Sequence, residues 1–493
     1  MKKIVRSSIS ATLLAMALNA GAQDRSFTKF SKQDLIDDMK LGMEILKKQH
    51  PNPYKFIDSV SYQRKVDSLL QKMTEQPDVF ACNQFSPIGL LRDVHTSLAY
   101  SEENSRDMYS KINAFPIPVI IEREKMLVNA RGLQVPFGSE IINIDGLTTE
   151  ELIRFATNLS YSDGWINTGI DRAYGDFQTR FSLRNVQKKS YDVTFRAPGS
   201  KDLKKATLPA ATPAQAFHTT RQSVMPVNQL QRAHYVYSDF LPETQTGILT
   251  VNSFNLQESY AYKEFSEFFR ELNKLKYKNV IIDIRSNGGG NPAISALLYS
   301  FLTAKPFRNE YNYRTRTIDM TYAEYAVAQG RVMSEEDIRN NKNFLYQRFD
   351  KDSASRFYIG NARLKEGQLE NFPPDKDAFN GNVYVLTGGG TVSAATYFAA
   401  LVQRNKRGLI VGKETGSGEQ STTAAWFLTY QLPKTKSILT VPMSELYFFN
   451  STADNGGGVL PDRTMPIEKF VSYVRESQDP EVSYTLELIG NKK

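Results

Sequence analysis

Apolar residues recur at helical spacing soon after residue 30. They are Leu35, Met39, Met43, Ile45 and Leu46. Ser31 or Asp34 can cap the start of this helix, and Pro51 ends it because proline cannot continue the helical hydrogen-bond ladder. A second helical pattern covers residues 61–73. These patterns predict a helical N-terminal region over residues 23–110.

The pattern changes to short strand-like runs in residues 111–205. The runs are 115–122, 126–129 and 139–146. The last run ends in an Asp-Gly turn, after which Thr149 can cap a helix. A glycine followed by an isoleucine-rich strand and Asp-Gly resembles a PDZ domain, which binds peptides by adding a strand to a sheet edge. A generic β-rich module gives a similar pattern.

Strands and helices alternate from residue 230 to 475. Strand-like runs cover 233–237, 247–251 and 279–284, a helical pattern covers 262–275, and the alternation resumes over 382–412. This order predicts an α/β domain, with the polar residues 306–376 as an insertion lying over it. Residues 378–403 carry no charge, but three glycines interrupt them. A strand, a turn and a buried helix therefore fit this stretch better than a membrane span.

The first 22 residues have the pattern of a secretory signal peptide. Three basic residues precede an apolar run over residues 9–18, and a small-x-small cleavage site follows at Ala20-Gly21-Ala22. The apolar run is too short to span a bilayer, and no cysteine follows the cleavage site to accept a lipid. We therefore expect an exported protein, periplasmic or secreted, without stable membrane insertion.

Composition excludes several classes of protein. Of the 493 residues, 41% are hydrophobic and 23% are charged, which supports packed cores in more than one domain rather than disorder. Removing the three basic residues of the leader reduces Lys and Arg from 61 to 58, against 53 Asp and Glu. This small excess is spread along the chain, so we expect no nucleic-acid partner. Cys82 is the only cysteine, which excludes an internal disulfide or a thiolate metal site and indicates a packed small hydrophobe.

A weak internal repeat carries the most informative chemistry. Asn279-Val280 opens a strand that leads to the glycine run 288–290, and Asn382-Val383 opens one that leads to the glycine run 388–390. A helix start follows each turn, where free N–H groups and the helix dipole favour negative charge. Two such units side by side can supply two N–H donors to one oxyanion. A phosphate cradle and plain tight turns are the alternatives, and phosphate is disfavoured because no Gly-Lys-Ser/Thr follows either turn.

The two serines of the repeat differ in position. Ser393 lies three residues after Gly390, at the predicted first turn, where its hydroxyl is exposed and the N–H of Ala394 is free. Ser295 lies five residues after Gly290, inside the predicted helix. Ser393 is therefore the better candidate nucleophile, with helix capping as its alternative role.

Four segments stand in a recognisable order between about residues 245 and 465. They are Asp-Ile-Arg-Ser-Asn-Gly-Gly-Gly at 283–290, Thr-Val-Ser-Ala-Ala at 391–395, Val-Gly-Lys-Glu-Thr-Gly at 411–416 and Gly-Val-Leu-Pro-Asp at 458–462. Together they resemble the C-terminal processing (tail-specific) peptidase family, which includes the tricorn core protease. The resemblance implies a crotonase-like α/β fold, serine peptidase chemistry, a peptide or protein substrate, and no metal or organic cofactor.

Members of that family use one of two general bases. The Ser–Lys design places a lysine in a Gly-Lys-Gly context, and Gly418 stands at that place here. Lys413, just upstream, is predicted to be a surface charge at a strand end. The tricorn-like design takes a histidine from an Asp-x-His-Thr segment, which this chain has at residues 93–96. The resemblance therefore implies His95 as the base, and a neutral imidazole suits that role at neutral pH.

The site implied by the resemblance has a nucleophile, a base, an oxyanion hole and a substrate-binding surface. Its residues are, in that order, Ser393; His95; Gly289 and Ala394; and Gly288 and Gly388. Two positions depart from the tricorn-like pattern. Val94 stands where a serine precedes the histidine, and Asn455 aligns with a glutamate upstream of Gly-Val-x-Pro-Asp. We expect Asn455, ahead of Asp454, to orient the imidazole of His95 as the third catalytic member.

A protein from a different class fits the same segments. A non-catalytic peptide-binding protein would retain the fold while Val94 and Asn455 mark lost activity. An acyl-thioester enzyme follows from fold analogy only, and the secretory signal disfavours it.

Overall fold

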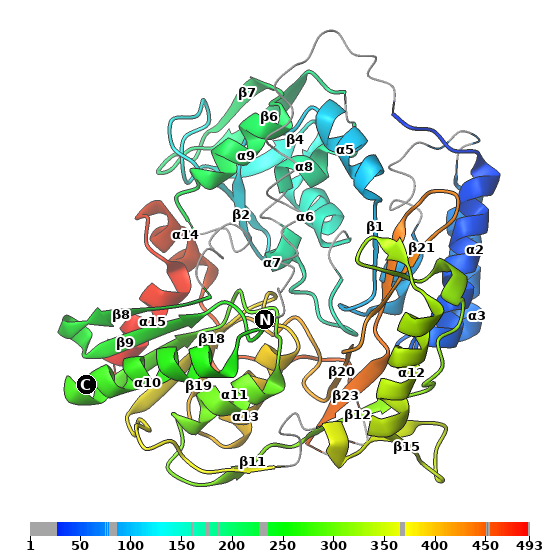
Figure 1. Cartoon of the computed structure of the whole chain (residues 1–493). Helices are drawn as coiled ribbons and strands as arrows, with labels where there is room; N and C mark the ends of the chain where they lie inside the picture. The colour runs from blue at the N-terminus through cyan, green and yellow to red at the C-terminus, as the bar shows by residue number, and fades with distance from the viewer. Residues whose placement is uncertain are drawn as a thin grey trace.

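The computed structural model describes residues 27–73, 75, 77, 86–158, 161–173, 177–185, 187–225, 235–364, 370–449, 451 and 454–491. The predicted signal peptide, residues 1–22, and Cys82 lie outside these ranges. Among the helices in the described ranges, none is both long and apolar enough to cross a membrane. Helices and several sheets build the chain (Figure 1), which confirms the α/β class.

The N-terminal region is helical, as its apolar spacing predicts. Its helices are α2 (Lys32–Gln49), α3 (Ser59–Gln71), η1 (Ile88–Leu91) and α5 (Glu102–Lys111). The Ser31 hydroxyl accepts the N–H of Asp34 and so caps α2. Leu35 and Met39 are buried on the inner face of α2, which is the face that the sequence pattern predicted.

A short strand connects this region to the core. Strand β1 (Ser97–Ala99) pairs antiparallel with β22 (Ile438–Val441), with Ser97 opposite Thr440. Strand β22 in turn pairs with β21 (Leu428–Gln431). Residues 93–96 directly precede β1, so this pairing carries the Asp-x-His-Thr segment to the C-terminal half of the chain.

A six-stranded sheet follows in the order β2-β3-β4-β6-β7, with β5 paired to β4. Its elements are β2 (Val119–Glu122), β3 (Lys125–Val128), β4 (Glu140–Ile144), β5 (Leu147–Thr148), α6 (Thr149–Asn158), α7 (Ile170–Ala173), α8 (Phe177–Ser182), β6 (Ser190–Arg196), β7 (Leu203–Pro209) and α9 (Pro213–Arg221). Buried aromatic rings of Phe115, Phe181 and Tyr191 meet edge to face or tilted in its core. Strand β2 lies at an edge of this sheet, and none of the strands in the described ranges pairs with its outer side.

The central sheet has the order β19-β18-β10-β9-β8. Its strands are β8 (Val236–Leu241), β9 (Thr246–Val251), β10 (Asn279–Asp283), β18 (Asn382–Thr387) and β19 (Leu409–Gly412). All neighbours are parallel except β8, which is antiparallel to β9. The register places Asn279 opposite Asn382, so the two strands of the sequence repeat are direct neighbours.

Helices cover both faces of the central sheet, which explains why its strands are apolar without alternation. Val280, Ile282 and Val383 face a core shared with α10 (Glu258–Lys274), α11 (Pro292–Ser300) and α13 (Ala394–Arg404). Ile281 and Tyr384 face the opposite side, which α15 (Pro480–Gly490) covers. Figure 1 shows α10, α11 and α13 together on one side of this sheet, with α14 (Ile467–Arg475) and α15 in red beyond β8 and β9.

Residues 306–376 do more than lie over the core. They supply β12, β15 and β16 to a five-stranded sheet of order β15-β16-β12-β23-β20. The elements of this part are β11 (Phe307–Arg308), β12 (Tyr311–Thr315), β13 (Val327–Ala328), β14 (Arg331–Val332), α12 (Glu335–Arg348), β15 (Phe349–Lys351), β16 (Tyr358–Gly360) and β17 (Asn371–Phe372), and their partners are β20 (Ser421–Ala424) and β23 (Ser444–Phe448). The predicted insertion thus forms one sheet with strands that follow Ser393 in the sequence.

Candidate active site

Ser393 occupies a strained backbone position immediately before α13. Its φ of 60° and ψ of −122° lie in a region that residues with a Cβ rarely adopt. Two hydrogen bonds hold the preceding loop: the Val392 N–H donates to the Asn287 carbonyl, and the Thr391 hydroxyl donates to the Ile284 carbonyl. Ser393 is buried, with 8% of its surface exposed, so the expectation of an exposed hydroxyl is wrong. Its position is that of a tight strand-to-helix turn, which can present a serine hydroxyl to substrate.

The glycine turn after β10 packs directly against Ser393. Gly289 has a φ of +94°, and a Cβ placed on it would lie 2.7 Å from the Ser393 Cβ and 2.8 Å from the Val392 carbonyl oxygen. A residue other than glycine would have to shift the nucleophile. The two glycine turns of the repeat therefore meet in space.

The two predicted oxyanion donors have different surroundings. The Ala394 N–H opens α13, where no intrahelical acceptor exists, and it finds no acceptor among the described residues. The Gly289 N–H donates to the side-chain oxygen of Asn287 at 2.9 Å. Gly289 can therefore serve an oxyanion only as a shared donor.

Gly288 and Gly388 line two different cavities. Gly288 lines a cavity of about 330 Å³ together with Tyr235, Asn252, Ser253, Asn255, Gly289 and Gly290. Gly388 lines a second cavity, at the carboxyl ends of the central strands, and its N–H donates to the Thr391 hydroxyl. Of the two predicted substrate-binding glycines, only Gly288 thus shares a cavity with Gly289.

Ser295 has a structural role. It is fully buried in α11, and its hydroxyl donates to the Ala394 carbonyl at 2.8 Å. This bond fastens α11 to the first turn of α13. Ser295 thus packs two helices together, and Ser393 remains the candidate nucleophile of the two.

His95 lies partly buried at the end of the Asp-x-His-Thr segment. Its Nδ1 is 3.3 Å from the hydroxyl of Thr422 in β20, and its ring stacks on Phe427 with centroids 6.1 Å apart. Burial lowers the pKa of His95 below its ordinary value, and the carboxylates of Asp163 and Asp93 oppose this shift without overcoming it. The imidazole is therefore neutral at neutral pH.

Asp93 holds the loop that carries His95. One carboxylate oxygen accepts the backbone N–H of His95 at 2.7 Å and the Thr423 hydroxyl at 2.7 Å. The other oxygen accepts the Thr96 hydroxyl at 2.8 Å and lies 2.5 Å from His50 Nε2. Burial acts to raise the pKa of Asp93, but the hydrogen bond to His50, the electrostatic effect of His50 and His95, and the Thr423 hydrogen bond together outweigh it and hold the pKa well below its usual range.

His50 is buried at the end of α2 and completes the Asp93 environment. Its Nδ1 accepts the N–H of Asn52 at 3.1 Å. A ring nitrogen that accepts carries no proton, so these hydrogen bonds assign the proton to Nε2, which donates to Asp93.

Asp163 is the second carboxylate beside His95. One oxygen accepts the Val94 N–H at 2.9 Å, and the other accepts the Gly418 N–H at 3.1 Å and the Thr422 hydroxyl at 2.6 Å. Burial and the charge of Asp93 raise the pKa of Asp163.

Asp93, His95 and Asp163 form a tight cluster in which one atom of each lies within 4.8 Å of the others. N–H and O–H donors already surround both carboxylates. The carboxylate oxygens are therefore used as hydrogen-bond acceptors, and the cluster is better described as a hydrogen-bond network than as a set of metal ligands.

One loop contacts both Ser393 and the residues around His95. The Ser393 N–H donates to the Ser417 hydroxyl at 2.7 Å, and the next residue, Gly418, donates its N–H to Asp163. Ser393 and the cluster around His95 therefore contact adjacent residues of the same loop.

That loop leaves no room for the lysine of a Ser–Lys design. A Cβ on Gly418 would lie 2.3 Å from the Ser421 carbonyl oxygen. A longer side chain therefore requires a different loop path.

Lys413 lies at a strand end, as predicted, but it is half-buried and ion-paired rather than a free surface charge. Its ammonium lies 2.7 Å from Asp171 and 2.5 Å from Glu122 in β2. Burial acts to lower the pKa of Lys413, but the two carboxylates outweigh it and hold the pKa well above its ordinary value. A lysine held in its charged form cannot act as a general base.

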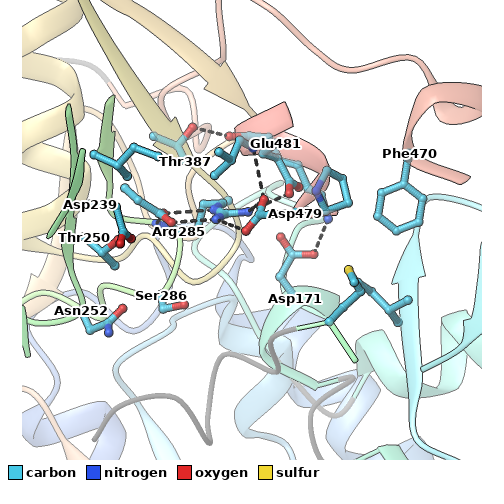
Figure 2. Close-up of a pocket in the computed structure, with 18 of the residues that line it drawn as sticks. Asp171, Asp239, Thr250, Asn252, Arg285, Ser286, Thr387, Phe470, Asp479 and Glu481 are labelled. Carbon is cyan, nitrogen blue, oxygen red and sulfur yellow. Dashed lines mark hydrogen bonds and ion pairs between the residues drawn. The ribbon is translucent and has the colours of Figure 1, made fainter. Parts of the chain in front are cut away.

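Lys413 lines the second cavity, of about 290 Å³, between the six-stranded sheet, the central sheet and α15. Figure 2 shows Arg285 in this cavity beside Asp479 and Glu481, with Asp171 nearby. Arg285 pairs with Asp283, Asp479 and Glu481 at 2.6 to 2.8 Å. The ion pairs of Lys413 and Arg285 in the wall of this cavity thus connect distant parts of the chain.

Asn455 and Asp454 lie apart from His95 in the described structure. Asn455 is exposed, and its side-chain oxygen accepts the Gly457 N–H at 2.9 Å. Asp454 pairs with Lys55 at 2.6 Å and accepts the Ser421 hydroxyl at 2.6 Å. Neither side chain contacts the imidazole of His95 in the part of the chain that the structure describes.

Sequence reasoning missed three residues that surround His95: His50, Asp163 and Thr422. His50 precedes a helix-ending proline, Asp163 stands in a polar loop, and Thr422 belongs to a Ser-Thr-Thr run. None of these contexts has a distinctive motif. The one signal in the sequence was Asn455, which stands where the family pattern has a glutamate and so indicated that another carboxylate would have to act on His95.

Comparisons with known proteins give one family match and several similar folds. Residues 245–465 match the model of peptidase family S41. No curated protein matches the sequence. Mature CPAF is 15% identical and aligns with a TM-score of 0.61 over 93% of this chain and 98% of its own. A mutant of CPAF is 14% identical, with a TM-score of 0.64 over 92% of this chain and 96% of its own. At these identities the likeness shows the fold.

The matched residues contain both glycine turns, the strained Ser393 and the loop that joins it to Asp163. These are the parts that a serine peptidase needs around its nucleophile. The part of the chain that carries Ser393 therefore matches peptidase family S41, a family of serine peptidases.

Proposed function

We propose that this chain is an exported serine peptidase that hydrolyses peptide bonds with Ser393 as nucleophile and His95 as general base. The observation that carries the proposal is the strained Ser393 before α13, packed against Gly289 with the Ala394 N–H open beside it. The neutral state of His95 supports its role as a base.

The reaction proceeds in two halves. The Ser393 oxygen attacks the peptide carbonyl carbon while His95 Nε2 takes the hydroxyl proton, and the carbonyl electron pair moves onto its oxygen. The N–H of Ala394, with a shared contribution from Gly289, stabilises that oxyanion. The imidazolium then gives its proton to the amine nitrogen as the C–N bond breaks, and water hydrolyses the acyl-enzyme with the same base.

The domain roles belong to the same proposal. The six-stranded sheet over residues 111–205 is a PDZ-like module, and the open edge of β2 suits an extended peptide added as a strand. The core over residues 230–475 is crotonase-like, and substrate passes Gly288 in its cavity. A leader over residues 1–22 directs export, so sequencing of the mature N-terminus from the periplasm or medium should start at Gln23.

A fluorophosphonate probe tests the nucleophile. Mass spectrometry should locate the adduct on the peptide that contains Ser393. Ser393→Ala should abolish the adduct and lower hydrolysis by at least about 10³-fold, with a melting temperature close to that of the parent, because a small hydroxyl contributes little packing.

Ser295→Ala is the matched control, because its hydroxyl contacts only the Ala394 carbonyl among the described residues. The control should keep the adduct. A folded parent protein that binds peptides but takes no label would instead support the alternative, a non-catalytic peptide-binding protein.

A further inference from the structure

We propose that Thr422 and Asp163 form a hydrogen-bonded relay that orients His95, with Asp163 in place of the acid that the aligned position 455 lacks. Both are positioning residues, since they act through the imidazole and do not touch the substrate. The inference rests on the proposed function, because it takes His95 as the general base.

The relay follows from the single proton of the Thr422 hydroxyl. That oxygen lies 2.6 Å from the Asp163 carboxylate and 3.4 Å from the Thr423 carbonyl. The short bond to a carboxylate is the stronger, so the proton points to Asp163. The Thr422 oxygen is then left as an acceptor for His95 Nδ1, 3.3 Å away.

This assignment sets the tautomer of His95. If Nδ1 carries the proton that Thr422 accepts, Nε2 carries the lone pair and can take the Ser393 proton. As the imidazolium forms, Thr422 remains its acceptor and the Asp163 charge stabilises it. Hydrogen bonds of this kind are often long in unliganded enzymes and shorten when substrate binds.

The Asp163 carboxylate is buried and held in position by backbone donors. Its side chain is 4% exposed, and the Val94 N–H and Gly418 N–H fix it from two separate loops. One of these donors precedes His95 in sequence, and the other lies one residue after the partner of Ser393. Asp163 therefore connects the base loop to the nucleophile loop.

The other carboxylates near the site bond to groups other than the His95 ring. Both Asp93 oxygens accept from the loop, from Thr423 or from His50. Asp454 pairs with Lys55. Asp163 is the described carboxylate that reaches the His95 ring through a hydroxyl.

The charged groups that act on His95 come from two loops and one helix. Asp163 and Asp93 raise its pKa, and Arg172 of α7 lowers it. Thr422 and the stacked Phe427 carry no charge. Neutralising Asp163 should therefore move the acidic limb of kcat/KM to lower pH, which a purely structural role would not do.

Asp163→Asn should reduce kcat by about 10²-fold or more, with KM within about threefold of the parent value, because the interaction strengthens as imidazolium forms. Its acidic limb should move to lower pH. Asp38→Asn is the matched control. Asp38 is 1% exposed and, like Asp163, accepts two backbone N–H groups and one threonine hydroxyl, from Lys434 and Thr435. This control should lose stability but keep the parent acidic limb.

A second pair of variants tests the hydroxyl. Thr422→Val should lower kcat by about tenfold or more, and Thr422→Ser should restore it to within about threefold, because serine keeps the hydroxyl. Thr435→Val is the control for loss of a buried threonine hydroxyl bonded to a carboxylate.

The outcomes separate the relay from the proposed function. Parent-like kcat and an unmoved acidic limb in folded Asp163→Asn overturn the relay, as does a fully active Thr422→Val. If Asp163→Asn does not fold, the Val and Ser variants of Thr422 decide alone. If the parent protein is labelled at Ser393, these results contradict only the relay. If the parent protein takes no label, the proposed function itself is overturned.

Discussion

Gly289 and Ser393 act as one unit, because the glycine supplies the space in which the serine side chain stands. The positive φ of both residues and their close approach are held by hydrogen bonds between the two loops. The conformational cost at Ser393 is of order 1–3 kcal/mol, which the surrounding fold must overcome.

Gly289→Ala should lower kcat by about 10²-fold or more, since the added methyl would lie 2.7 Å from the Ser393 Cβ and displace the nucleophile. The alanine is therefore not a mild substitution here, even though it keeps the N–H. Gly330→Ala controls for backbone strain alone, because Gly330 has a φ of +78° and nothing within 4 Å of a Cβ. Equal kinetics for the two variants would remove Gly289 from the nucleophile's environment.

Asn455→Gly should retain most activity, because the Asn455 side chain closes its own turn at Gly457 and glycine accepts turn conformations readily. Asn455→Glu should bring no gain in kcat, since the side chain at this position is exposed and bonds to the Gly457 N–H rather than to His95. Steady-state kinetics of both variants check this. A large rise in kcat with glutamate would support Asn455 as the third catalytic member instead.

At the scale of elements, Lys413 links three parts of the fold. It follows β19 of the central sheet, and it pairs with Glu122 at the end of β2 and with Asp171 in α7. Glu122 and Asp171 are both buried. Such an arrangement is sensitive to loss of one partner, because the charges left behind lose their compensation.

Lys413→Met should lower the free energy of unfolding by about 3 kcal/mol or more, measured by urea denaturation. Activity per folded molecule should persist, since Lys413 supplies no catalytic proton. Lys469→Met is the control, because Lys469 pairs with Glu487 at the exposed surface, where such pairs contribute about 1 kcal/mol or less. Loss of hydrolysis without loss of stability would restore a lysine base.

At the scale of the whole molecule, the pH dependence of activity reports how the N-terminal region meets the core. Strand β1 delivers His95 to the loops around Thr422, and the burial that results lowers the pKa of His95 below 6.5. The imidazole is protonated as pH falls, so a folded enzyme should lose activity on the acidic side.

The acidic limb of kcat/KM should therefore report one group with a pKa below 6.5, and His95→Gln should abolish activity at every pH. The free energy of unfolding should also decrease as pH falls. The unfolded chain binds the His95 proton more readily, so the contribution of this group is complete above pH 6.5 and declines as pH falls toward the folded pKa. A limb above pH 7 would contradict the described surroundings of His95.

Local pattern was enough to predict much of this protein. Apolar spacing and the Ser31 cap predict α2, and continuous apolar runs predict β10 and β18, because these features depend on neighbours a few residues away. The paired glycine turns identified Ser393, since a turn and a helix start are local events. The Asp-x-His-Thr segment identified His95 only through resemblance.

Only the tertiary structure decided which distant groups surround that histidine. Asp163 and Thr422 contact each other across 259 residues of sequence, and Lys413 and Asp171 across 242. Hydrogen bonds and ion pairs between distant loops leave no periodicity in either segment, since each loop needs only one suitable side chain at the meeting point. The same reason explains Asn455, whose aligned position predicted a contact with His95 while the loop around it folds onto Gly457 instead.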